Sequence, residues 1–88
     1  MEEKKFTAKL ETTADDGAWT YITWPESAEF FGTRKSVKVA GTIDGQEFKT
    51  SFLPMGGGVH MLPVKAAILS AIDKKAGDTV EVHLKERL

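Results

Sequence analysis

The segment Ser36–Leu53 constrains the fold most, because it carries the clearest hairpin pattern in the chain. Apolar and polar residues alternate on both sides of Asp44-Gly45, a dipeptide that favours the two-residue type I′ turn. Gly41 lies on the inward face of the first arm and predicts a bend or a close backbone approach rather than a site. The other inward positions of that arm are apolar: Val37, Val39 and Ile43.

Alternating runs at both ends of the chain predict further strands. Phe6, Ala8 and Leu10 share one face of the first run, and the turn residues 14–17 separate it from the aromatic-rich segment 18–24. These two runs predict a hairpin. Pro25–Gly32 predicts a single helical turn that ends at the glycine. The last run, residues 78–88, alternates in the same way and predicts a closing strand.

The segment Pro63–Ala76 predicts the one substantial helix. Proline is favoured at a first helical position, and Gly77 supplies the expected left-handed stop. A short strand, residues 59–62, precedes this helix. The chain therefore reads as a single mainly β domain over residues 1–88, with about six strands, one amphipathic helix before the last strand and one helical turn after strand two. The apolar stripe of the helix consists of Val64, Ala67, Ile68, Ala71 and Ile72.

Composition excludes several classes of protein. The 88 residues are 41% hydrophobic and 28% charged, with a net charge of -1, which argues against disorder and lowers the expectation of nucleic-acid binding. The absence of cysteine excludes disulfides and thiolate metal sites. No apolar run approaches the roughly 20 residues of a membrane span, and the charged N-terminus lacks a signal-peptide pattern. We expect a soluble, cytoplasmic protein.

Several motifs together resemble the bacterial domain-of-unknown-function family 1905. They are VAGTIDG around Asp44-Gly45, the glycines Gly56–Gly58, Leu62-Pro63-Val64, and the GDTV segment that begins at Gly77. The resemblance extends from Phe6 to Leu84 and implies a small double-split β-barrel whose biochemical role is undefined. Residues 61–82 are also similar to the Pro-helix-Gly-Asp-Val segment of AbrB-type swapped-hairpin DNA-binding regulators.

Gly56–Gly58 and His60 form the most conspicuous candidate site. A phosphate loop would run directly into a helix N-terminus, but residues 59–62 separate Gly58 from Pro63, and no Walker pattern is present. We therefore interpret the glycines, Gly57 included, as a corner between barrel strands. For His60 we expect a structural or rim position that contributes little burial. Its alternative role is a general base, with Ser51 or Ser70 brought near by the fold.

Aromatic and basic residues supply the remaining candidates. Trp19 and Trp24 lie on opposite faces of one strand, so one of them could present an aromatic anchor to a ligand, although we favour burial of both faces beneath the helix. Arg34 and Lys35, with Lys38 and Lys65, form the one local concentration of positive charge, which would suit a carboxylate, a phosphate or nucleic acid.

We expect a non-catalytic binding domain for a small ligand or a protein partner, acting as a monomer or homodimer. An AbrB-like nucleic-acid-binding regulator is the alternative, and an enzyme that uses His60 is the third possibility. No motif predicts catalytic residues, a metal site or a cofactor. The candidate binding residues are Trp19, Trp24, Arg34, Lys35, Gly57, His60 and Lys65.

Overall fold

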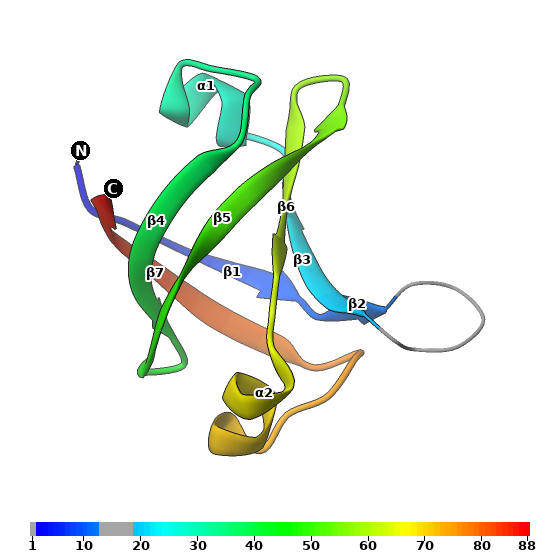
Figure 1. Cartoon of the computed structure of the whole chain (residues 1–88). Coiled ribbons are helices and arrows are strands. Elements are labelled where there is room, and N and C mark those ends of the chain that lie inside the picture. Colours follow the sequence, from blue (N-terminus) through cyan, green and yellow to red (C-terminus); the bar gives the residue numbers. More distant parts are fainter. Residues whose placement is uncertain (1, 13–18) are drawn as a thin grey trace.

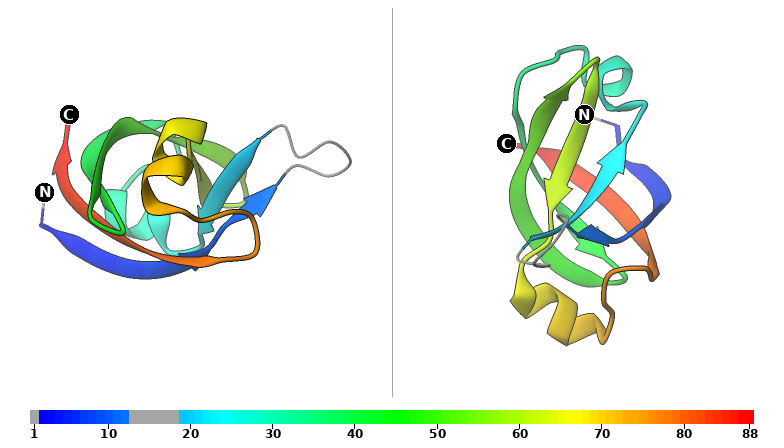
Figure 2. Two further views of the ribbon diagram at one scale, coloured as in Figure 1. Left: turned by 90° about the horizontal axis from the view of Figure 1, so that it is seen from below. Right: turned by 90° about the vertical axis from the view of Figure 1, so that its right-hand side faces the viewer.

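The computed structural model describes residues 2–12 and 19–88. One antiparallel sheet of seven strands curls into a nearly closed barrel, with a short helix at each end (Figures 1 and 2). The predicted mainly β barrel is confirmed, while the predicted turn at residues 14–17 lies outside the described residues. No helix in the described part of the chain is long and apolar enough to cross a membrane. The strands follow the order β1-β7-β4-β5-β6-β3-β2.

The elements have the following bounds. The strands are β1 (Lys4–Lys9), β2 (Glu11–Thr12), β3 (Thr20–Trp24), β4 (Val37–Ile43), β5 (Gln46–Gly56), β6 (Val59–Pro63) and β7 (Thr79–Arg87). The helices are α1 (Ser27–Phe31) and α2 (Ala66–Ile72).

The predicted hairpin at Asp44-Gly45 is confirmed as the β4–β5 connection. Asp44 has φ 48° and Gly45 has φ 85°, so both central residues have the positive φ that a type I′ turn requires. Val37, Val39 and Ile43 are fully buried in the barrel interior, as their alternation predicts. The type I′ turn and the burial of alternate residues in β4 are therefore consistent with the same β4–β5 register.

Gly41 marks a close backbone approach, as predicted. The β4–β7 register shifts between Ala40 and Gly41, which identifies a bulge. A Cβ atom at Gly41 would lie 2.1 Å from the carbonyl oxygen of His83. Only glycine allows the two strands to approach so closely at this bend of the barrel.

The barrel has seven strands because the first predicted strand changes partner at Leu10. β1 pairs with β7, whereas β2 pairs with β3. At the break, the Leu10 N–H donates to Asp78 O, and Leu10 O accepts from Gly77 N–H, both at 2.8 Å. The alternation of residues 6–11 shows the inward face of the run but not this change of partner.

The predicted helix Pro63–Ala76 is too long at both ends. Pro63 is the last residue of β6, and Val64 donates its N–H to Thr20 O in β3, so the chain stays extended up to Lys65. The helix ends at Asp73, which has φ 55°, not at Gly77. Three of its apolar side chains, Ile68, Leu69 and Ile72, still pack against the buried core.

The predicted helical turn after the second strand is confirmed as α1. It spans Ser27–Phe31, and Gly32 ends it in the left-handed region with φ 70°. Figure 1 shows α1 and α2 at opposite ends of the barrel.

Asp44 connects the β4–β5 turn to its neighbours and makes stability depend on pH. Although burial alone would raise the pKa of Asp44, the hydrogen bond from Glu81 N–H and the ammonium of Lys74 lower it below the ordinary value. A lowered pKa in the folded state contributes stability at neutral pH that disappears as the pH falls through that pKa.

We therefore expect Asp44→Asn to reduce the free energy of unfolding at pH 7 and to have less effect at an acidic pH below the lowered pKa of Asp44, where the folded wild-type carboxylate becomes protonated. Urea unfolding at both pH values measures the difference. Asp73→Asn, at the other positive-φ aspartate, controls for the amide. A deficit that stays constant with pH would show that the charge of Asp44 contributes nothing.

Candidate functional site

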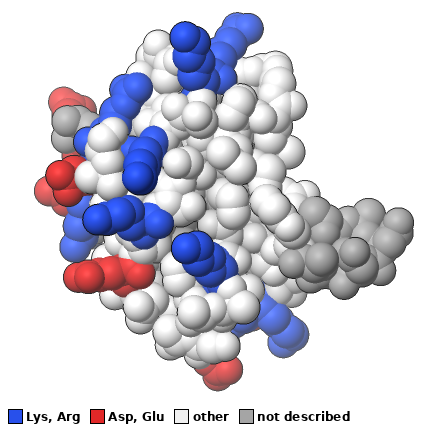
Figure 3. Space-filling model, in the orientation of Figure 1, with Lys and Arg blue, Asp and Glu red and all other residues white. Residues whose placement is uncertain are grey.

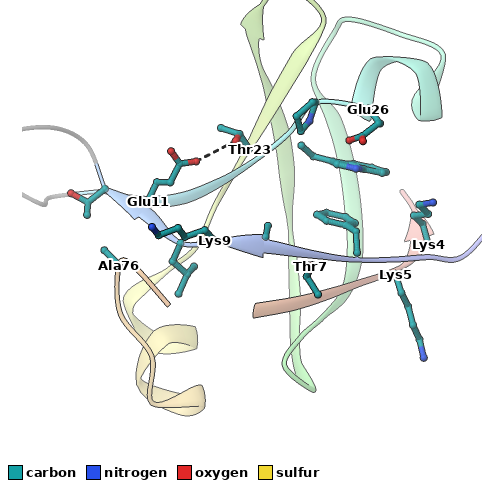
Figure 4. A pocket seen from close by; sticks show the side chains of 15 residues that line it. Lys4, Lys5, Thr7, Lys9, Glu11, Thr23, Glu26 and Ala76 are labelled. Carbon is teal, nitrogen blue, oxygen red and sulfur yellow. Dashed lines mark hydrogen bonds between the residues drawn. The ribbon is translucent and has the colours of Figure 1, made fainter. Parts of the chain in front are cut away.

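The largest hollow lies where the barrel is not closed by strand pairing. β1 is one end of the strand order, and within residues 2–12 and 19–88 no ladder joins it to β3. The two strands diverge (Figure 2). A groove of about 1030 Å³ lies beside them, which we call the seam groove (Figure 4). It is lined by residues 4–12 and 23–26 together with Ala76 and Gly77.

Aromatic side chains from both strands form the inner wall of the seam groove. The Trp24 ring stacks on Phe6 with centroids 4.4 Å apart and planes 9° from parallel. Phe30, Phe31 and Phe52 surround Trp24 at centroid distances of 5.2 to 5.9 Å. Trp24 is only 4% exposed, so this wall is a rigid part of the core. The sheet is thus closed by side-chain packing where backbone pairing stops.

Charged side chains border this aromatic wall. Figure 4 shows Lys4, Lys5 and Lys9 along β1, with Glu11 and Glu26 near the opposite strand. Glu11 Oε2 accepts a hydrogen bond of 3.2 Å from the Thr23 hydroxyl, which spans the narrow end of the groove. The lysine-rich strand β1 therefore offers positive charge beside an apolar surface.

Of the two positions expected for His60, the structure shows the structural one, and the expected rim position with little burial is wrong. His60 is 0% exposed, and so is Ser27 of α1. His60 Nε2 lies 2.8 Å from Lys35 O; because a carbonyl only accepts, Nε2 carries the proton. His60 Nδ1 then accepts from the Ser27 hydroxyl at 2.7 Å, and Ser27 Oγ accepts from the His60 N–H at 2.9 Å.

These three hydrogen bonds make His60 a buried connector rather than a base beside a pocket. They join β6 to α1 and to the chain just before β4, and Phe31 and Phe52 pack against the imidazole edge-on. The predicted serine partners, Ser51 and Ser70, are not those that contact it. No sequence signal identifies Ser27, which is 33 residues away along the chain.

His83 is the second histidine of the chain. It is half-buried on β7, and its Nε2 lies 2.6 Å from Glu3 Oε1. Within residues 2–12 and 19–88, no group of three histidine, aspartate or glutamate side chains gathers to hold a metal ion.

The glycines form the predicted corner between strands. Gly56, Gly57 and Gly58 have φ values of 93°, 64° and 82°, and they connect β5 to β6. A Cβ atom on Gly57 would meet nothing within 4 Å. Glycine is therefore favoured there by backbone conformation and not by crowding.

The structure divides the other predicted site residues between the two ends of the barrel. Arg34 and Lys35 precede β4 near the glycine corner. A Cβ atom on Gly58 would lie 4.0 Å from Arg34 Nε. Lys65 lies at the start of α2, at the other end (Figure 1), so the predicted basic concentration is split.

Trp19, which is 49% exposed, shares a shallow hollow with Lys65. The prediction that the helix before the last strand covers this strand is wrong: Trp19 is exposed, and Trp24 is buried by Phe6 of β1 and Phe31 of α1. The apolar side chains of α2 pack into the core instead.

The main residues that sequence reasoning missed lie on β1. Lys5, Thr7 and Lys9 alternate with the inward Phe6 and Ala8. Lysine at successive outward positions is typical of an edge strand, and this signal could have identified the open side of the barrel.

We expect His60→Ala to lower the free energy of unfolding by about 3 kcal/mol, because it leaves Lys35 O without its donor and opens a cavity in the core. Ser27→Ala should cost about 1–3 kcal/mol, and the double variant should cost less than the sum. Chemical denaturation measures these effects, with His83→Ala as a control whose surface pair is worth no more than about 1 kcal/mol. A negligible loss for His60→Ala would mean that the imidazole is not the connector described.

The family comparison supports the resemblance to the domain-of-unknown-function family 1905. No curated protein matches the chain. The family model described as Domain of unknown function (DUF1905) matches residues 6–84, which include every strand except the first two residues of β1 and the end of β7. The chain belongs to this DUF1905 family, a domain of unknown function.

Proposed function

We propose that this protein is a non-catalytic binding domain and that the seam groove is its binding site. The carrying observation is that the one side of the described sheet without a strand ladder coincides with the largest hollow, which has an aromatic wall. A groove that combines a rigid apolar surface with a few charged groups is the usual form of a ligand site.

The arrangement of the Ser27–His60 pair supports the non-catalytic part of the proposal. A nucleophile and its base must reach a substrate, and both of these side chains are 0% exposed. The second imidazole nitrogen faces the carbonyl oxygen of Lys35 rather than a carboxylate, so the usual third member of such a relay is replaced by backbone. The hydrogen bonds of Ser27 and His60 therefore serve to connect α1, β6 and the chain before β4.

An aromatic sulfonate dye, 8-anilinonaphthalene-1-sulfonate, is a suitable probe because its ring matches the aromatic wall and its charge matches the lysines. The test uses Trp19→Phe, which leaves Trp24 as the sole tryptophan. We expect the dye to quench Trp24 by energy transfer, and Ala8→Glu, which places a carboxylate in the groove, to weaken binding by about tenfold, a change of about 1.4 kcal/mol.

Ala40→Glu, on the outer side of β4, is the matched control and should leave the affinity unchanged. Thermal melts establish that each variant is folded. Saturable binding that responds equally to both substitutions, or no binding at all, would contradict the seam groove as the site.

Nucleic-acid binding is the second candidate, and the distribution of charge favours it. Lysine and arginine side chains gather on the face of the barrel that carries β4 and β5 (Figure 3). Lys38 and Lys49 are exposed on these strands. They are diagonal neighbours across the ladder, because Lys49 pairs with Ala40, two residues from Lys38 along β4. Glu47 and Glu86 interrupt this surface, and the whole chain has a net charge of -1.

We expect no binding to duplex DNA tighter than about 1 μM at physiological salt, because few phosphates could be neutralised at once. A fluorescence anisotropy titration at several salt concentrations measures this. Tighter binding that weakens with salt and disappears in Lys38→Glu/Lys49→Glu would make the regulator, similar to AbrB-type proteins, the better assignment.

A further inference from the structure

The free edge of β1 presents a defined set of backbone groups to the seam groove. In an antiparallel ladder, residues alternate between those that bond the partner strand and those whose N–H and C=O point away from it. The Leu10 N–H bonds Asp78 O, which continues the β1–β7 register by one pair and fixes the alternation. Ala8, Phe6 and Lys4 therefore bond β7.

The backbone groups of Lys5, Thr7 and Lys9 consequently point toward the open side of the sheet. The hydrogen bonds on the other side of β7 lead to the same alternation. Asp44 N–H, one residue beyond β4, bonds Glu81 O, so the Glu81 carbonyl points toward β4 and away from Thr7, its register partner in β1. Within the described residues, no strand forms a ladder with this edge of β1. Such an edge is a template for an added strand.

The side chains of β1 determine which strand would fit. The exposed Lys5 and Lys9 lie on the outer face, on either side of Thr7, while Phe6 and Ala8 face inward beside Trp24. An added strand opposite Thr7 would place its two nearest neighbours over the aromatic wall and its next residues opposite the lysines. Opposite charges in such cross-strand pairs stabilise a sheet.

A second copy of this chain fits poorly on the same edge. Two β1 strands paired about Thr7 would place Lys5 of each chain opposite Lys9 of the other. Like charges directly opposite each other destabilise the pairing. The lysines therefore favour an acidic partner over self-association.

We propose that the seam groove binds an extended acidic peptide segment of a protein partner, which adds to β1 as an antiparallel strand. The segment carries two acidic residues separated by apolar–any–apolar, so that the acids meet Lys5 and Lys9 and the apolar residues contact Phe6, Ala8 and Trp24. This inference rests on the proposed function and names the class of partner for that site.

The probe is a short peptide, acetylated and amidated, with the sequence TEVTVET, titrated to about 1 mM into isotopically labelled protein and followed by amide chemical shifts. We expect the largest shifts at Lys5, Thr7 and Lys9, which would gain backbone hydrogen bonds. The peptide TKVTVKT, with the acids replaced by lysines, should bind about tenfold more weakly or not at all.

Two sets of protein variants test the mechanism. Thr7→Pro removes the N–H at the centre of the free edge and should abolish binding, whereas Thr7→Val keeps that N–H and should not. Lys5→Glu/Lys9→Glu should reverse the preference, so that TKVTVKT binds and TEVTVET does not. This exchange of charge remains decisive if Thr7→Pro fails to fold.

The absence of shifts up to about 1 mM, shifts confined to another face, or equal binding of both peptides would overturn the peptide proposal. If the dye still binds at the seam groove in that case, the binding-domain proposal stands and only the class of partner is wrong. If neither probe binds there, both proposals fail.

Discussion

The change of strand partner at Leu10 is the constraint on which the rest of this barrel depends. The backbone of this buried residue is hydrogen-bonded to Gly77 and Asp78, just before β7. Beyond it the chain leaves β7 and pairs with β3, so one run of sequence serves both ends of the sheet. The two ends of the sheet are thereby joined at Leu10, and β1 and β3 diverge on the N-terminal side of this residue.

The divergence creates both the weak side of the barrel and its candidate site. Trp24 and Phe6 stack across the gap and bury the interior without backbone pairing, an aromatic contact worth about 0.5–1.5 kcal/mol beyond its buried area. Within the described residues, the edge of β1 beside this contact forms no strand ladder. The seam groove is therefore a consequence of how the sheet closes.

Local patterns predicted those parts of the fold that are decided by neighbouring residues. Asp44-Gly45 specifies its turn because both residues tolerate positive φ, and the alternation in β4 and β7 specifies the buried face. The predicted start of the helix was wrong because the Val64 N–H bonds Thr20 O at the start of β3, a tertiary contact that holds Pro63 and Val64 extended. Sequence candidates for the site fared similarly: Trp24 lines the groove, but His60 is buried and Lys65 lies far from Arg34.

The sequence by itself determined a mainly β chain with glycine-containing turns, a helix before the last strand and an alternating apolar core, because these features follow from backbone sterics and from the periods of strands and helices. Tertiary structure alone decided that His60 connects α1 to β6 and that β1 pairs with β7. Both outcomes depend on which segments meet across more than thirty residues of chain. Hydrogen bonding and strand pairing over such distances leave no periodic trace in the sequence.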